Sequence, residues 1–223
     1  MNMEYPHYHG EVQKGKYVDE VLRSYFPDYN YKGIFLDIGA YEPINISNSY
    51  HFEKNGWEVH CFEANTLLID TLKSQRKNVY NYAISYEDKE NITFNVVKGP
   101  WGGGSLMAGL SAIELDPQYL EVFQDEIKEV FQINVPQKKI NTVLEEEIFI
   151  NTLDETKNID IISIDVEGGE LNVLKGIDLV KYKPKLFVIE NVFNNRNIPD
   201  YLEPFGYCLD QTIDYNQYYI LRS

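Results

Sequence analysis

Two apolar segments of the sequence end in the same way, at an acidic residue close to glycine. The first, Phe35–Ile38, contains Asp37 and is followed by Gly39, and the second, Ile161–Ile164, is followed by Asp165. Short apolar runs bounded by such turn residues predict buried strands. Ligands bind at the carboxyl ends of strands in open α/β sheets, so the pattern predicts an α/β fold with a functional site at these two ends.

The order of the remaining segments favours the same fold class. We expect strands at 33–38, 57–62, 79–84, 92–97, 138–143, 159–165 and 185–191, helices at 12–26, 47–54, 66–73, 117–131 and 169–175, and a hairpin from 206–209 and 218–221. The alternation of strand and helix predicts a parallel sheet, and the hairpin adds a reversed strand at its edge. The glycine-rich segment 99–105 is expected to be a loop. Residues 1–223 are expected to form a single domain, with a helical extension at 1–30.

The charge balance limits the possible partners. Against 20 Lys and Arg, the chain carries 35 Asp and Glu, for a net charge of −15. Binding to nucleic acid requires clustered cations, so the composition argues against a nucleic-acid partner. No apolar run approaches the roughly 20 residues of a membrane span, and the N-terminus lacks the pattern of a secretory signal. A cytoplasmic protein is therefore expected.

The turn after the first strand is the first candidate ligand site. Gly39 permits close approach of a ligand, and the N–H groups of the turn are expected to hold a carboxylate or phosphate. The dinucleotide fingerprint requires three glycines, whereas Tyr41, Glu42 and Pro43 follow here. The sequence therefore argues against a nicotinamide-dependent oxidoreductase and favours a ligand with a small carboxylate. A tight turn without a ligand is the alternative interpretation.

Glu63 ends the next expected strand and is the second candidate. An acid at this position binds the ribose diol in nucleotide-binding α/β folds. Ala83 and Ile84 end the third expected strand, where they would line an adenine slot. The alternatives are a helix cap for Glu63 and ordinary core packing for Ala83 and Ile84.

The candidate catalytic groups follow two later strands. Asp165 and Glu167 would face one side of a continuous strand, and Glu190 and Asn191 end the next one. Such oxygen groups act as a general base or bind a divalent cation such as Mg2+ or Mn2+, so we predict Asp165 and Glu167 as catalytic groups and Asp165, Glu190 and Asn191 as metal ligands. The alternative for Glu167 is a helix cap. His51 is a further catalytic candidate, with a half-exposed helical histidine as the alternative.

With these residues assembled, the chain resembles the FkbM-type family of S-adenosylmethionine-dependent methyltransferases. The segments that carry the resemblance are 35–43, 48–50, 53–57, 62–65, 159–170, 174–176, 187–190 and 201–207. The run Asp-Val-Glu-Gly-Gly-Glu at 165–170 is the most specific of them, whereas methyltransferases in general share the first. The glycine-rich loop and the acidic stretch 145–147 have no clear counterpart in the family.

The resemblance implies a class I methyltransferase (Rossmann-like) fold with a mostly parallel seven-stranded sheet, an antiparallel C-terminal hairpin and helices on both faces. It implies that S-adenosylmethionine is bound by Asp37, Gly39, Ala40, Tyr41, Asn48, Ser49, Glu63, Ala64, Ala83, Ile84 and Asp165. It further implies O-methylation of a hydroxyl, with a sugar or glycan as the preferred acceptor. The alternatives are a small natural product as acceptor, or a non-catalytic domain that binds S-adenosylmethionine or a glycan. The oligomeric state is left open.

Overall fold

The computed structural model describes residues 8–98, 111–115, 117–122, 124–125, 127–149 and 158–222. The expected loop at 99–105 and residues 1–7 of the expected N-terminal extension lie outside the described residues. In the part of the chain that is described, no helix is long and apolar enough to cross a membrane.

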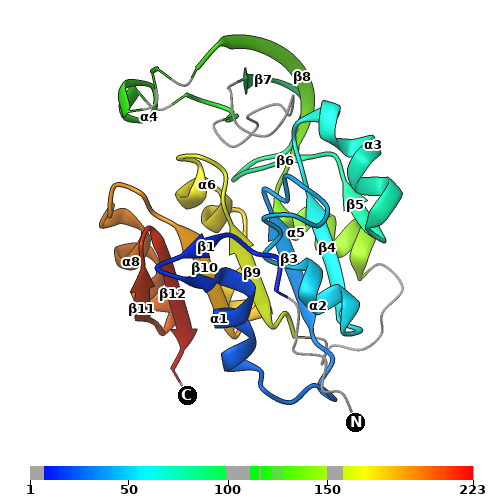
Figure 1. Cartoon of the computed structure of the whole chain (residues 1–223), viewed down its shortest axis with the longest axis vertical. Helices are drawn as coiled ribbons and strands as arrows, with labels where there is room; N and C mark the ends of the chain where they lie inside the picture. Colours follow the sequence, from blue (N-terminus) through cyan, green and yellow to red (C-terminus); the bar gives the residue numbers. More distant parts are fainter. Residues whose placement is uncertain are drawn as a thin grey trace.

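A seven-stranded sheet forms the centre of the molecule, in the order β11-β12-β10-β9-β3-β4-β5 (Figure 1). Its strands are β3 (Ile34–Ile38), β4 (Glu58–Phe62), β5 (Asn78–Tyr80), β9 (Ile161–Ile164), β10 (Leu186–Glu190), β11 (Tyr207–Ile213) and β12 (Asn216–Leu221). Neighbouring strands from β5 to β10 are parallel, whereas β12 is antiparallel to both β10 and β11. The predicted parallel sheet with a reversed C-terminal strand is confirmed.

Helices pack on both faces of this sheet. They are α1 (Val18–Tyr25), α2 (Tyr50–Lys54), α3 (Thr66–Gln75), α5 (Ile140–Val143), the π-helical turn η2 (Leu144–Ile148), α6 (Glu170–Lys175), α7 (Leu179–Tyr182), α8 (Asn197–Leu202) and the 3-10 turn η3 (Glu203–Phe205). The short helix α4 (Pro117–Val122) lies away from the main sheet (Figure 1). The core side chains of α1, α2 and α3 form one buried cluster with the sheet, and those of α5, η2, α6, α7 and α8 form another.

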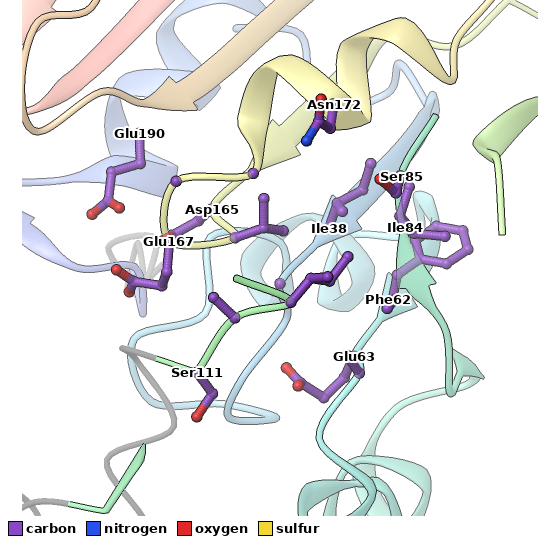
Figure 2. A pocket seen from close by; sticks show the side chains of 18 of the residues that line it. Ile38, Phe62, Glu63, Ile84, Ser85, Ser111, Asp165, Glu167, Asn172 and Glu190 are labelled. Atoms are coloured by element: carbon purple, nitrogen blue, oxygen red, sulfur yellow. The ribbon is translucent and has the colours of Figure 1, made fainter. Parts of the chain in front are cut away.

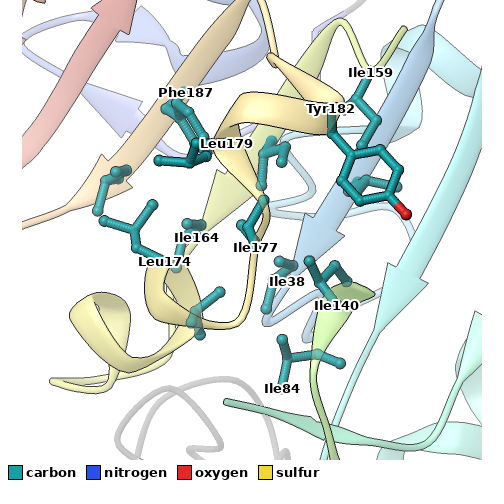
Figure 3. Packing of buried hydrophobic residues seen from close by; sticks show 14 of the residues in the cluster. Ile38, Ile84, Ile140, Ile159, Ile164, Leu174, Ile177, Leu179, Tyr182 and Phe187 are labelled. Carbon is teal, nitrogen blue, oxygen red and sulfur yellow. The ribbon is translucent and has the colours of Figure 1, made fainter. Parts of the chain in front are cut away.

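The central strands bury both of their faces. Ile38 of β3 packs with Ile140 of α5 and Leu174 of α6 in one cluster (Figure 3). Phe35, on the same strand, points to the other face, where its ring contacts Phe52 of α2 at a centroid distance of 5.3 Å. Successive side chains of a strand point to opposite faces, and both faces are covered here, which explains why these strands are almost entirely apolar in the sequence.

Two smaller elements lie outside the main sheet. One is a three-stranded sheet of β6 (Ala83–Ile84), β8 (Glu129–Lys138) and β7 (Lys89–Lys98), which extends beyond one end of the main sheet (Figure 1). The other is an N-terminal hairpin of β1 (Val12–Gln13) and β2 (Lys16–Tyr17), whose turn contains Lys14 and Gly15 at φ 47° and 77°. This hairpin immediately precedes α1.

Four expected elements differ from the structure. The helix expected at 12–26 is wrong for 12–17, because the left-handed turn closes a hairpin there and the helix begins at 18. The strand expected at 79–84 divides into β5 and β6, which belong to different sheets. The helix expected at 117–131 ends at 122, and its last residues belong to β8. The strand expected at 138–143 is instead helix α5, because Ile140, Val143 and Leu144 must face one core cluster, which requires helical spacing.

Asp160 joins three chain segments at the end of the sheet where β3, β9 and β10 begin. One carboxylate oxygen accepts a hydrogen bond from the backbone N–H of Ile34 at 2.9 Å. The other oxygen accepts one from the hydroxyl of Tyr31 at 2.6 Å and lies 2.6 Å from the Lys185 ammonium. The Asp160 side chain is 3% exposed, so these three groups replace the water that an ionised carboxylate would otherwise bind.

We expect Asp160→Ala to lower the free energy of unfolding by about 2–4 kcal/mol, because it leaves a buried backbone N–H without its acceptor. Chemical denaturation followed by circular dichroism measures this loss. Lys185→Ala is the control, and it should cost less than about 1 kcal/mol, because the Lys185 side chain is 47% exposed. Equal losses in the two variants would contradict the central role of the carboxylate.

Candidate active site

A cavity of about 610 Å³ lies at the carboxyl ends of β3, β4, β9 and β10. Twelve of the predicted site residues line it, namely Asp37, Gly39, Ala40, Tyr41, Asn48, Glu63, Ala64, Ala83, Ile84, Asp165, Glu167 and Glu190. Figure 2 shows Asp165, Glu167 and Glu190 at one end and Phe62, Ile84 and Ser85 at the other. The sheet thus brings together the ends of strands that are far apart in the sequence.

Gly39 allows the tips of β3 and β9 to meet. It has a φ of +88°, and a Cβ at this position would lie 1.8 Å from the backbone oxygen of Asp165. The N–H of Asp165 donates to the carbonyl of Ile38 at 3.0 Å, so the two turns are joined directly. No residue other than glycine fits this contact without displacing the Asp165 backbone.

The N–H groups of the first turn are already paired. Those of Gly39 and Ala40 donate to the carbonyl of Phe62 at 3.0 and 3.1 Å, and that of Tyr41 donates to the carboxylate of Glu63 at 3.0 Å. The expectation that these three groups are free to hold a carboxylate or phosphate is therefore wrong, because the turn folds back onto the tip of β4. Gly39, Ala40 and Tyr41 nevertheless line the cavity.

Glu63 is fixed at the tip of β4. Besides the N–H of Tyr41, its carboxylate accepts the N–H of Asn65 at 2.7 Å, and Asn65 in turn caps α3. Burial raises the pKa of Glu63 to about 7, against the opposing effect of these two hydrogen bonds. Its orientation toward the cavity is therefore set before any ligand binds.

A buried hydrogen-bond network fixes the side chain of Asp37. Its carboxylate accepts a hydrogen bond from the hydroxyl of Ser49 at 2.5 Å, and that hydroxyl accepts one from Arg76 at 2.7 Å. Arg76 also forms a buried ion pair with Glu53 and donates to the carbonyl of Pro43 at 3.2 Å. Burial raises the pKa of Asp37, and the Arg76 guanidinium opposes that rise.

Ser49 does not line the cavity, and its predicted contact with the cofactor becomes a supporting contact with Asp37. Arg76 is absent from the residues that the sequence predicts. No local pattern marks it, because it follows α3 and reaches the loop before α2 only in the folded chain.

Three carboxyl groups gather at the acidic end of the cavity. Asp165, Glu167 and Glu190 offer oxygen atoms that lie within 4.8 Å of one another. Burial, together with the charges of Glu170 and Glu11, raises the pKa of Asp165 to about 7. Burial and the charge of Asp165 also raise the pKa values of Glu167 and Glu190. At neutral pH this group therefore holds protons that isolated carboxylates would have lost.

The position of Glu167 depends on a turn rather than on a strand. β9 ends at Ile164, and Glu167 and Gly168 have φ values of 58° and 101°. The carboxylate of Glu170 stabilises this turn by accepting the N–H of Gly168 at 2.9 Å. The strand does not continue to 167, yet the two acids lie together as predicted.

Besides Ser49, two predicted site residues lie outside the cavity lining. His51 is buried beneath α1, where its Nε2 accepts a hydrogen bond from Arg23 at 3.2 Å and its ring lies 4.7 Å from that of Tyr8. The Nδ2 of Asn191 donates a hydrogen bond to the Oε1 of Gln217 at 2.9 Å, and this contact anchors the loop after β10. The structure therefore gives His51 and Asn191 packing roles, and the acidic group has Glu167 where Asn191 was expected.

Other cavity residues come from segments that no sequence motif marked. They include Glu11, Ile46, Tyr82, Phe94, Ser111, Asn172 and Tyr215. The cavity residue Asn48 has one buried side-chain atom that accepts no hydrogen bond from the described residues. Its Nδ2 donates to Ser163 at 3.3 Å, whereas its buried Oδ1 has no hydrogen-bond partner among the described residues. A buried polar atom of this kind is an available acceptor for a ligand.

The raised pKa of Asp165 predicts a pH-dependent effect on stability. An acid with a pKa of about 7 in the folded state and about 3.9 in the unfolded state binds more protons when folded, so its contribution to stability falls as the pH rises between these values. We expect the melting temperature of Asp165→Asn, relative to wild type, to be higher at about pH 8 than at about pH 5.

Thermal unfolding of the ligand-free protein at both pH values measures this effect. Asp200→Asn is the control, because the Asp200 side chain is 57% exposed and pairs with Arg196 on the surface. Its difference from wild type should change little with pH. A pH-independent difference for Asp165→Asn would contradict the raised pKa.

Comparison with known families agrees with this arrangement. The family model of the methyltransferase FkbM domain matches residues 37–209, from the acid of the first strand to the C-terminal hairpin. No curated protein sequence matches the chain significantly. The matched segment covers most of the chain and contains both strand tips that meet at Gly39. The chain therefore belongs to the methyltransferase FkbM domain family.

Proposed function

We propose that the protein is an S-adenosylmethionine-dependent O-methyltransferase acting on a hydroxyl, preferably of a sugar or glycan. The observation that carries the proposal is the single cavity that joins the Gly39 turn and Glu63 to the acids Asp165, Glu167 and Glu190. We assign the main sheet to the class I methyltransferase (Rossmann-like) fold, because its parallel strands lead into a reversed C-terminal hairpin. We also propose that residues 1–223 form a single domain.

The residues present fit the methyl donor in two respects. Gly39, Asn48 and Glu63 line the same cavity, and the buried Oδ1 of Asn48 accepts no hydrogen bond from the described residues. In the proposal, Asn48 accepts a hydrogen bond from the ammonium of the methionine moiety beside Gly39. Glu63 binds the ribose hydroxyls, and Ala83 and Ile84 line the adenine slot at the apolar end.

In the proposal, the acids at the other end of the cavity activate the acceptor hydroxyl. S-adenosylmethionine, when bound, supplies a methyl group on a positively charged sulfur. Asp165 takes the proton of the acceptor hydroxyl as the oxygen electron pair forms its bond to the methyl carbon and the carbon–sulfur electron pair returns to sulfur. A pKa near 7 makes Asp165 a stronger base than an ordinary carboxylate. Holding the two reactants in line contributes about 7–11 kcal/mol toward the barrier.

A divalent cation provides a second version of the same step. Asp165, Glu167 and Glu190 are spaced to hold Mg2+ or Mn2+, which would lower the pKa of the acceptor hydroxyl. The two versions differ in their sensitivity to chelation, because only the second requires a bound cation.

Calorimetry with S-adenosylhomocysteine and with NAD tests the cofactor assignment. We expect binding of the first and none of the second. We further expect Gly39→Ala to weaken S-adenosylhomocysteine binding at least about tenfold, because the added methyl displaces Asp165. Gly206→Ala is the matched control, with the same φ of +88° but an ordinary contact 3.5 Å from Leu221. Binding of NAD instead would indicate an oxidoreductase.

Asp165→Asn tests the acidic end. We expect kcat to fall by about 10²–10⁴, with binding of S-adenosylhomocysteine retained, because the amide accepts no proton. The measurement is the mass gain of a methyl group on a panel of glycans and small hydroxyl compounds, with and without EDTA. Loss of activity on chelation supports the metal version. Activity that survives both EDTA and Asp165→Asn contradicts both versions, and binding without turnover on any acceptor indicates a non-catalytic domain.

A further inference from the structure

Two residues of the cavity wall lie outside the segment that matches the family. The family model covers residues 37–209, whereas Glu11 lies directly before β1 of the N-terminal hairpin and Tyr215 lies in the turn between β11 and β12. The hydroxyl of Tyr215 donates a hydrogen bond to one carboxylate oxygen of Glu11, and Gln13 donates to the other at 2.9 Å. The Glu11–Tyr215 hydrogen bond therefore joins an N-terminal and a C-terminal segment of the chain at the cavity.

The N-terminal hairpin is attached to the rest of the protein at both ends. On one side, buried Asp19 accepts the N–H groups of His9 and Gly10 at 2.7 and 3.0 Å. On the other, the N–H of Lys14 donates to Asp214 at 3.0 Å, and the two side chains form an ion pair at 3.5 Å. These contacts fix the backbone around Glu11, so its carboxylate has a defined position.

Glu11 lies at the acidic end of the cavity. The carbonyl of Tyr215 accepts the N–H of Asn191 at 2.7 Å, which places the Glu11–Tyr215 pair beside the end of β10 and Glu190. The negative charge of Glu11 also raises the pKa values of Asp165 and Glu167. In the proposed reaction, Glu11 is thus on the acceptor side, away from the apolar slot at Ile84.

The charge of this end favours one chemical class of acceptor. Among the described lining residues Lys89 is the one cation, and its ammonium lies 2.5 Å from the Glu87 carboxylate. The other charged residues of the described lining, which include Glu11, Asp165 and Glu167, are all acidic. An ammonium group on the acceptor gains favourable interaction with such a surface, whereas a carboxylate is repelled. An adjacent ammonium also makes a hydroxyl more acidic, which assists loss of its proton.

We propose that Glu11, held in place by Tyr215, is a specificity-determining residue that selects a hydroxyl compound bearing an ammonium group, of the amino-sugar type. This inference rests on the proposed function, because it assumes that the acidic end receives the acceptor. It assigns a role in acceptor choice to a segment of the chain that the family match does not include.

Three sugars with the same ring test the inference, namely glucosamine, glucose and glucuronic acid. Their dissociation constants are measured by NMR titration of the protein saturated with S-adenosylhomocysteine, at a pH where the amine is protonated. We expect glucosamine to bind more tightly than glucose, and glucuronic acid to bind most weakly. Glu11→Gln keeps an acceptor for Tyr215 but removes the charge, so we expect it to reduce the preference for glucosamine over glucuronic acid about tenfold.

Glu203→Gln is the matched control, because Glu203 is exposed on η3 and does not line the cavity. It should keep the wild-type preference. Absence of a preference for glucosamine in the wild-type protein overturns the acceptor class, and an unchanged preference in Glu11→Gln overturns the role of Glu11. Failure of the protein to bind S-adenosylhomocysteine is a separate result, which contradicts the proposed function itself.

Discussion

The site depends on the close contact between Gly39 and the backbone of Asp165. β3 and β9 are neighbours in the sheet, and their turns can meet only because no side chain stands between them. The hydrogen bond from Asp165 to Ile38 then fixes the distance between the proposed cofactor turn and the acidic end. A larger residue at position 39 would push the two turns apart and separate the two halves of the cavity, even if the strands of the sheet kept their positions.

Around this contact, buried acids occupy two different environments. A buried network of Ser49, Arg76 and Glu53 supports Asp37, and the guanidinium of Arg76 offsets its charge. Asp165 and its neighbours face one another, and burial and mutual repulsion destabilise their charged forms. The first arrangement favours a rigid support for the proposed cofactor site. The second leaves a set of basic oxygens that can accept a proton or a positive charge.

The walls of the cavity come from outside the main sheet. β6 and β7 contribute Ile84 and Phe94 on one side, and the N-terminal hairpin contributes Glu11 on another. The main sheet thus supplies the strand tips, and the added segments determine the shape and charge of the space above them.

The sequence by itself determined the parallel sheet, the reversed C-terminal hairpin and the two acidic strand tips, because buried strands and glycine turns leave local patterns. It did not determine that His51 would pack against Arg23 or that Asn191 would bind Gln217, since those contacts join distant segments. It gave no sign of Arg76 or Glu11 for the same reason. Only the tertiary structure decided which side chains face the cavity, because that depends on how the helices and the hairpin pack around the sheet.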